Sequence, residues 1–216
     1  APVGTGPFRF VSRAVQDHMI LERFEDYWGT PAKLDKVTFK ILENAEGLVL
    51  GLQSGALDLV AHLSSDQTAQ LNKSDFEIAE GSMNLVQALY LNNAEKPFDD
   101  VRVRQALCYA VDKQAVIDLA FDGYGIPLGT SMFPSFSKYY DESLTDYYTL
   151  NVEKAKELLK EAGYPDGFEM TITVPSNYTP HVNTATVLVE LLREIGVKAT
   201  VQPVDWGTWL EEVYGN

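Results

Sequence analysis

The sequence predicts an α/β protein of two lobes, and three observations support this prediction. Expected strands and helices alternate along the first part of the chain, which favours a layered fold with at least partly parallel strands over an all-β barrel. From Asp100 the pattern changes to longer helices. The chain has 216 residues, 45% of them hydrophobic and 22% charged, which is enough to bury a sizeable core. A shift in composition at residues 92–97 places the expected boundary between residues 1–91 and 92–216.

The first elements are expected to form a hairpin and a third strand. Residues 8–15 and 18–24 are rich in aromatic and β-branched side chains, and only Gln16 and Asp17 separate them. This arrangement is typical of two strands joined by a tight turn. Residues 37–42 alternate Val, Phe and Ile with polar residues and extend the same pattern to a third strand.

A helix is predicted over residues 45–54, because Gly55 follows where a glycine commonly ends a helix. A short buried strand is then expected at residues 57–61. Ser64 offers the side-chain oxygen that caps a helix amino terminus, so a second helix is expected to continue through Leu71.

The rest of the chain is expected to continue this alternation and then to become richer in helix. Further strands are predicted at residues 76–79, 85–91, 168–174 and 197–204. Helices are predicted at residues 101–111, 113–121, 152–162 and 182–195, with a last one from Trp206. The stretch from Gly123 to Ser137 is rich in Pro, Gly and aromatic residues and is expected to be a loop.

Charge and hydropathy exclude several classes of protein. Seventeen Lys and Arg against thirty-one Asp and Glu give a net charge of −14, which repels nucleic-acid phosphates and argues against nucleic-acid binding. The longest uncharged stretch, residues 47–57, is shorter than the roughly 18 apolar residues of a membrane-spanning helix. Residues 1–7 lack the basic and apolar regions of a signal peptide, which is therefore expected to be missing or already removed.

The sequence predicts no catalytic group, metal site or cofactor. His18, His62 and His181 are scattered and match no pattern of metal ligands. Cys108 is the only cysteine, and we expect it to act as a small buried hydrophobic residue in its helix. The glycines of residues 123–129 have the wrong spacing for a dinucleotide-binding loop.

A series of motifs, in the same order along the chain, resembles the family 5 extracellular solute-binding proteins of dipeptide and oligopeptide importers. The motifs are PVGTGPF at residues 2–8, LERFEDYWG at 21–29, LQSGALDL at 52–59, KPFDDVRVRQAL at 96–107, AVDK at 110–113, AKELLKEAGY at 155–164, IGV at 195–197 and DW at 205–206. They cover most of the chain.

The resemblance implies a class II periplasmic-binding-protein fold whose two lobes close on a solute. Such a protein is a non-catalytic receptor that delivers di- or oligopeptides to the membrane subunits of an ABC permease. The resemblance further implies a monomer in the periplasm or outside the cell, anchored through a lipoprotein segment that precedes this chain. The chain is expected to be an incomplete fragment, with part of the first lobe followed by the start of the second.

The same resemblance assigns candidate ligand-binding residues to the loops and strands that line the cleft in peptide binders. These candidates are Ala61, His62, Leu63, Ala88, Tyr90, Ser176, Asn177, His181, Trp206 and Tyr214. For His62, a place in the cleft and a place in an ordinary surface loop are equally compatible with the sequence. The chain departs from dipeptide binders in one respect, since no Arg lies near Ser176 to anchor a peptide carboxylate.

Several functions therefore stay open at this point. Peptide is the leading ligand class only because it is frequent in the family, and an oligosaccharide, a nickel complex or another nutrient is compatible with the same motifs. A different class is an extracellular hydrolase, for which the sequence shows no catalytic constellation. A third is an interaction protein that feeds a sensor or chemoreceptor.

Overall fold

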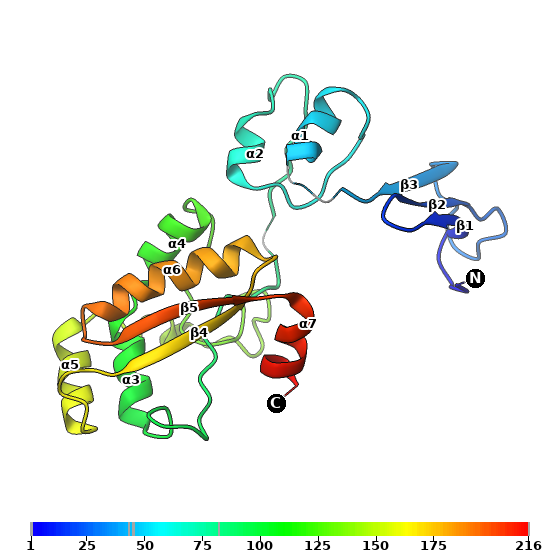
Figure 1. The fold of residues 1–216 in the computed structure, drawn as a ribbon. Helices are drawn as coiled ribbons and strands as arrows, with labels where there is room; N and C mark the ends of the chain where they lie inside the picture. The colour runs from blue at the N-terminus through cyan, green and yellow to red at the C-terminus, as the bar shows by residue number, and fades with distance from the viewer. Residues whose placement is uncertain (1, 43, 45, 82, 216) are drawn as a thin grey trace. The chain divides into compact units, whose positions relative to one another are not determined.

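The computed structural model describes residues 2–42, 44, 46–81 and 83–215. The chain forms two compact units, Ala1–Glu80 and Gly81–Asn216, which are described separately below (Figure 1). The division into lobes at residue 92 stays a prediction, because the compact units of this chain do not define the lobes of a longer molecule.

The first unit contains a three-stranded antiparallel sheet. Its strands β1 (Phe8–Ala14), β2 (His18–Arg23) and β3 (Lys36–Lys40) lie in the order β1-β2-β3. The predicted hairpin and third strand are confirmed. Side chains of β1 alternate between half-buried and exposed positions, which is the period of a strand with one covered face. The β1–β2 register shifts between Phe10 and Ser12, where one extra residue forms a bulge.

Two short helices complete the first unit. Helix α1 (Glu46–Gln53) ends before Gly55, whose φ of +71° is in the left-handed region that favours glycine. Helix α2 (Ser65–Ala69) begins with a capping box, in which Ser64 and Gln67 each accept a hydrogen bond from the other's backbone N–H. Helix α1 ends one residue before the predicted end at residue 54, and its predicted start at residue 45 lies outside the described residues. Helix α2 ends two residues before the predicted end at Leu71.

Three predicted strands are wrong. Residues 57–61, 76–79 and 85–91 have no strand assignment, and Leu59, expected to be buried, is 81% exposed. A strand depends on hydrogen bonds to a neighbouring strand, and the described part of the chain supplies no partner for these segments. Their apolar composition therefore does not lead to a paired strand.

The second unit is built around two parallel strands joined by a helix. Strand β4 (Glu169–Pro175), helix α6 (Thr179–Arg193) and strand β5 (Lys198–Val204) follow one another, and β4 pairs with β5 in parallel from Glu169–Lys198 to Pro175–Val204. Parallel strands need such a crossover connection, and α6 supplies it. In Figure 1, α6 runs along the β4–β5 pair. This unit confirms the predicted β-α-β succession.

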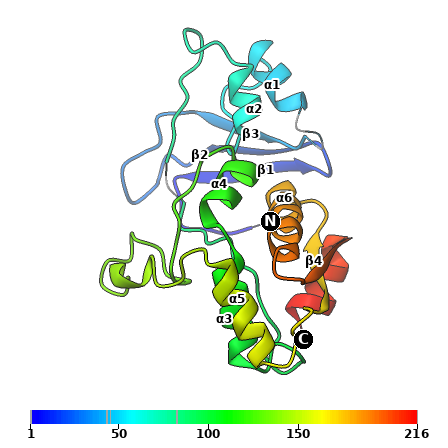
Figure 2. The same cartoon turned by 90° about the vertical axis from the view of Figure 1, so that its left-hand side faces the viewer.

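Three further helices pack in the second unit. Helix α3 (Val101–Ala110) lies beside α5 (Val152–Glu161), as Figure 2 shows, and α4 (Lys113–Phe121) packs against α6. A single 3-10 turn, η1 (Glu142–Leu144), lies in the long connection before α5. None of the helices in the described part of the chain is long and apolar enough to cross a membrane.

The core of the second unit lies where α3, α5, α6 and β5 meet. Val103, Leu159, Leu192 and Val197 are its largest fully buried side chains. A second cluster, formed by Ile172, Val174, Ala185 and Leu188, fills the space between α6 and the two strands. The two clusters fix α6 on the sheet and thereby fix the loop that leads into its amino terminus.

The prediction that Cys108 is buried is wrong, because its side chain is exposed. The buried side of α3 is formed by Val103, Ala106, Leu107 and Ala110, which recur at helical spacing. Cys108 lies about 100° around the helix from Leu107 and leaves this stripe. Partial desolvation nonetheless raises the pKa of its thiol, and Lys113 opposes this effect.

Arg102 joins the beginning of α3 to the end of α5. Asp100 caps α3 by accepting from the Arg102 backbone N–H at 2.8 Å, and its carboxylate also accepts from the Arg102 guanidinium at 2.6 Å. The same guanidinium donates to the Glu161 carbonyl at 2.8 Å. The hydrogen bonds from Arg102 hold the pKa of Asp100 at about 2.

Replacing Asp100 by Asn is expected to remove a pH-dependent contribution to stability. The folded-state pKa of about 2 lies below the ordinary 3.8, so the carboxylate stabilises the fold above pH ~4 and this contribution disappears as the pH falls towards 2. The difference in melting temperature between the protein and Asp100→Asn should therefore be constant above pH ~4 and shrink below it. Asp99→Asn is the control, because the Asp99 carboxylate has no ion pair in the described structure. A difference that stays constant down to pH 2 would contradict the assignment.

Candidate functional site

The candidate site lies at the carboxyl ends of β4 and β5. Residues 176–178 follow β4 directly, and the Ser176 backbone N–H donates to the Val204 carbonyl at 2.8 Å, which holds this loop beside the end of β5. Asp205 follows β5 in the same way. In open α/β sheets, ligands bind in the crevice outside the carboxyl ends of the strands. The two loops therefore meet where this fold commonly places a ligand.

Five ring side chains from these loops form a continuous series, named here the aromatic row. His181 stacks on Tyr178 with ring centroids 5.4 Å apart and ring planes 24° apart. Tyr178 lies 5.3 Å from Trp206, which stacks on Trp209 at 5.4 Å and 12°. Tyr214 lies 5.4 Å from Trp209 and ends the row. Tyr178, Trp206 and Tyr214 are exposed, at 42%, 41% and 75%, so the row presents ring surface to solvent.

The residue after β5 sets the position of the two tryptophans. Asp205 caps the short helix α7 (Trp206–Thr208) by accepting from the backbone N–H groups of Gly207 and Thr208 at 3.0 and 3.1 Å. The Thr208 hydroxyl, which also donates to this carboxylate, is the main cause that lowers the pKa of Asp205. Trp206 and Trp209 are three residues apart and therefore share a face of the turn. The following π-helical turn η2 (Trp209–Tyr214) packs against β4.

His181 is the titratable member of the row. It lies in the first turn of α6, and its Nδ1 is 2.9 Å from the Gln87 Oε1. Partial burial lowers the pKa of this imidazole below 6.5. Gln87 belongs to an extended segment in which Leu89 packs on the second core cluster while Ala88 and Tyr90 are exposed. This alternation is what an extended chain gives when it lies on a core.

The structure brings together only some of the residues expected from the sequence. His181, Trp206 and Tyr214 are in the aromatic row, and Ser176 and Asn177 form the exposed loop beside it. Their role in binding stays a prediction, as does that of Ala88 and Tyr90, which is 90% exposed.

The other expected residues belong to the first unit. Ala61 and His62 are exposed, Leu63 is half-buried, and His62 has a φ of +61°. The left-handed region is uncommon for a residue other than Gly, and such backbone strain clusters at functional sites. The assignment of these three residues to a ligand site stays a prediction.

Sequence reasoning did not include Gln87, Tyr178 or Trp209 among the candidates. Tyr178 follows two residues that were included and lies beside Trp206, while Trp209 is three residues after Trp206 and has the same aromatic character. Gln87 could have been found from its position in the extended segment. It is a polar residue two positions before Leu89, so it lies on the same side of the segment as this core-packed residue.

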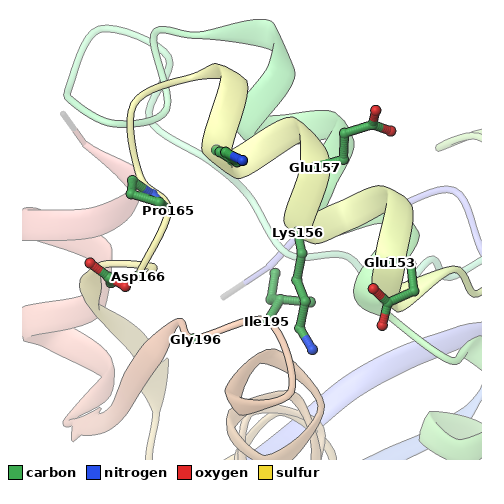
Figure 3. A pocket seen from close by; sticks show the side chains of 8 residues that line it. Glu153, Lys156, Glu157, Pro165, Asp166, Ile195 and Gly196 are labelled. Atoms are coloured by element: carbon green, nitrogen blue, oxygen red, sulfur yellow. The ribbon is translucent and has the colours of Figure 1, made fainter.

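A separate hollow of about 460 Å³ lies at the opposite ends of the two strands (Figure 3). Pro165 and Asp166, which precede β4, and Ile195 and Gly196, which precede β5, line it together with Glu153 and other charged residues of α5. It therefore lies at the amino ends of the strands, away from the aromatic row. Acidic and basic side chains alternate along the part of α5 that lines this hollow. The hollow therefore does not present a strong charge of one sign.

No group of three or more His, Cys, Asp or Glu side chains in the described residues could hold a metal ion. The aromatic row itself has the chemistry of a surface for organic groups. Ring faces and edges favour stacked and edge-to-face contacts with apolar and planar groups, while the Tyr hydroxyl and Trp N–H groups provide hydrogen bonds.

An α/β unit with ring side chains at the carboxyl ends of its parallel strands is typical of a protein that binds a small molecule. Over residues 1–216, this chain matches the bacterial extracellular solute-binding proteins, family 5 middle, and it belongs to that family. The resemblance inferred from the sequence motifs is thus confirmed.

Individual relatives support this assignment. The chain is 35% identical to the glutathione-binding protein GsiB of Pectobacterium atrosepticum over 99% of its own length, and 34% identical to that of Salmonella typhimurium. It covers 41% and 42% of those two proteins, so it spans about two-fifths of the length of these relatives.

Solved structures confirm the fold of a periplasmic binding protein. AgaA from A. tumefaciens R10, in complex with agropinic acid, matches with a TM-score of 0.77 and 29% identity, over all of this chain and 44% of AgaA. The ABC transporter-associated periplasmic binding protein DppA from Helicobacter pylori, in complex with the peptide STSA, matches with a TM-score of 0.75 and 30% identity, over 97% of this chain and 40% of DppA.

Proposed function

We propose that this chain is part of a non-catalytic receptor that binds a short peptide or peptide-like solute and delivers it to an ABC importer. The receptor acts as a monomer in the periplasm or on the outer face of the membrane. The aromatic row at the carboxyl ends of β4 and β5 is the observation that carries this proposal, because it offers an exposed surface for an organic solute.

Two relatives favour peptides over the other solutes that the sequence leaves open. GsiB is named as a glutathione-binding protein, and DppA is bound to the peptide STSA. Glutathione is itself a tripeptide, so both names describe the same ligand chemistry. The absence of an Arg near Ser176 implies that a peptide carboxylate is held by a group elsewhere in the protein.

A thermal-shift screen of the full-length protein tests this function. Glutathione and di- to pentapeptides should raise the melting temperature, while sugars and nickel chelates should not. A ligand that binds only the folded state at 100 times its Kd adds about 2.7 kcal/mol to the free energy of unfolding. Each ligand is also checked for turnover, because hydrolysis would support an enzyme instead.

Replacing Trp206 by Ala is expected to weaken peptide binding about tenfold, since an aromatic contact is worth up to ~1.5 kcal/mol. The control is Tyr139→Ala, an exposed aromatic residue outside the row (64% exposed, against 41% for Trp206), which should leave the affinity unchanged. Stabilisation by a sugar or chelate alone would overturn the peptide assignment. No stabilisation by any of these solutes would overturn it too, and would point to an unusual solute or a partner-docking role.

A further inference from the structure

The hydrogen bond between His181 and Gln87 fixes the tautomer of the imidazole. Nδ1 of His181 lies 2.9 Å from Oε1 of Gln87. An amide oxygen can only accept a hydrogen bond, so Nδ1 is the donor. In a neutral imidazole one nitrogen carries the proton and the other has a lone pair. Nε2 of His181 is therefore a hydrogen-bond acceptor whenever the ring is neutral.

This acceptor is open to solvent. Nε2 of His181 makes no hydrogen bond within the described part of the chain, where the only side-chain hydrogen bond of the ring is that of Nδ1. Every buried side-chain nitrogen or oxygen in the described residues has a hydrogen-bond partner, so an atom without one cannot be buried. One face of the ring meanwhile stacks on Tyr178, which holds it in place beside the aromatic row.

The surroundings of His181 favour the neutral ring. Burial lowers the pKa of its imidazole, and the positive end of the α6 dipole also disfavours a cation in the first turn. The elements that pack against α6 carry the ionisable groups Arg102, Arg104, Cys108, Tyr109, Lys113, Asp118, Glu169 and Lys198, and α6 itself carries Glu190 and Arg193. None of these groups is a cause of the pKa shift of His181, for which burial is the only cause.

We propose that His181 determines specificity in the solute site proposed above by accepting, through Nε2, a hydrogen bond from an ammonium or amide N–H of the solute. Gln87 is a positioning residue that keeps Nδ1 protonated and Nε2 free. A site built to receive a donor rejects a solute that offers only acceptors, because Nε2 would then lose its hydrogen bond to water without replacement.

The same geometry makes binding sensitive to pH. When His181 takes up a proton, both ring nitrogens become donors and Nε2 can no longer accept a hydrogen bond from the solute. The affinity is therefore full above the pKa of His181 and falls as the pH decreases through it. Release of the solute is favoured in acid.

Isothermal titration calorimetry of the full-length protein between pH 5 and 8 tests this inference. The probe is reduced glutathione, or the peptide that stabilises the protein most in the screen, each with a free and with an acetylated amino terminus. His181→Phe keeps a ring that stacks on Tyr178 but removes Nε2, so we expect about tenfold weaker binding at pH 8 and no loss of affinity in acid.

Gln87→Glu provides a second readout that a merely structural role would not change. A carboxylate next to Nδ1 favours the imidazolium, so the pH at which binding weakens should move upward. The matched control Gln114→Glu, on the exposed side of α4, should leave the pH profile unchanged.

The acetylated probe identifies the donor group of the solute. If acetylation weakens binding to the wild type but not to His181→Phe, the donor is the ammonium. If the wild type binds both forms equally, the donor is an amide N–H.

The failures of the two proposals are distinguishable. Tight binding of the probe by His181→Phe with an unchanged pH profile would overturn the role of His181 and leave the receptor function standing. Failure of every peptide to bind the wild type would overturn the peptide assignment and the inference with it.

Discussion

Leu192→Ala is expected to lower the free energy of unfolding of the protein by about 3 to 5 kcal/mol. Leu192 is on α6, is 0% exposed, and belongs to the cluster with Val103, Leu159 and Val197. Truncation removes apolar contacts and leaves a cavity that three packed elements cannot close completely. The loss is a large share of the 5 to 15 kcal/mol that typically stabilises a domain. Urea denaturation followed by tryptophan fluorescence measures it.

The control for this substitution is Leu119→Ala on α4. Leu119 is 69% exposed, so the same change in side chain should alter stability by no more than about 0.5 kcal/mol. Similar losses for the two variants would show that the stability of the second unit does not depend on the cluster around Leu192.

Gly167→Ala is expected to destabilise the protein by about 2 to 5 kcal/mol, because two separate effects act at this position. Gly167 has a φ of +80°, which L side chains rarely adopt. A Cβ placed there would also lie 2.0 Å from the backbone carbonyl oxygen of Gly196. That carbonyl cannot shift freely, since the Lys198 backbone N–H two residues later donates to the Phe168 carbonyl at 2.8 Å.

Gly163→Ala separates the two effects. Gly163 also has a left-handed backbone, with a φ of +93°, but a Cβ there would meet no atom within 4 Å. Only the backbone strain remains, so a loss of about 1 to 2 kcal/mol is expected. Equal losses for the two variants, measured as shifts of the urea midpoint, would mean that the contact with Gly196 is relieved by movement of the backbone.

Local signals in the sequence predicted most of the helices and strands of this fold. The ends of α5 carry such signals: Asn151, which accepts a hydrogen bond from the Lys154 backbone N–H, caps its start, and Gly163 follows its end. The β1–β2 hairpin was equally clear, because its strands are adjacent in sequence. The three segments predicted wrongly as strands share one property: their structure depends on pairing with another segment, which a pattern of apolar residues does not reveal.

The candidate site was less predictable, because its geometry comes from the meeting of two loops that are distant in sequence. The resemblance assigned Trp206 and His181 to the ligand site, and nothing in their local sequence indicated that Tyr178 lies between them. The hydrogen bond from His181 to Gln87 spans 94 residues. Such contacts depend on how α6 sits on the sheet, and the core clusters that fix α6 are formed by the whole second unit.

The crossover from β4 through α6 to β5 also has a consequence for the order of folding. The β1–β2 turn closes a short loop, and hairpins of this kind form in about 1 to 10 μs. Pairing of β4 with β5 must first bring together segments separated by the whole of α6, and the Arg102–Glu161 contact closes a loop of 59 residues. Contacts of such long sequence separation slow folding, because chain entropy is lost before the contacts form. The carboxyl edge that carries the aromatic row is therefore expected to form more slowly than the β1–β2 hairpin.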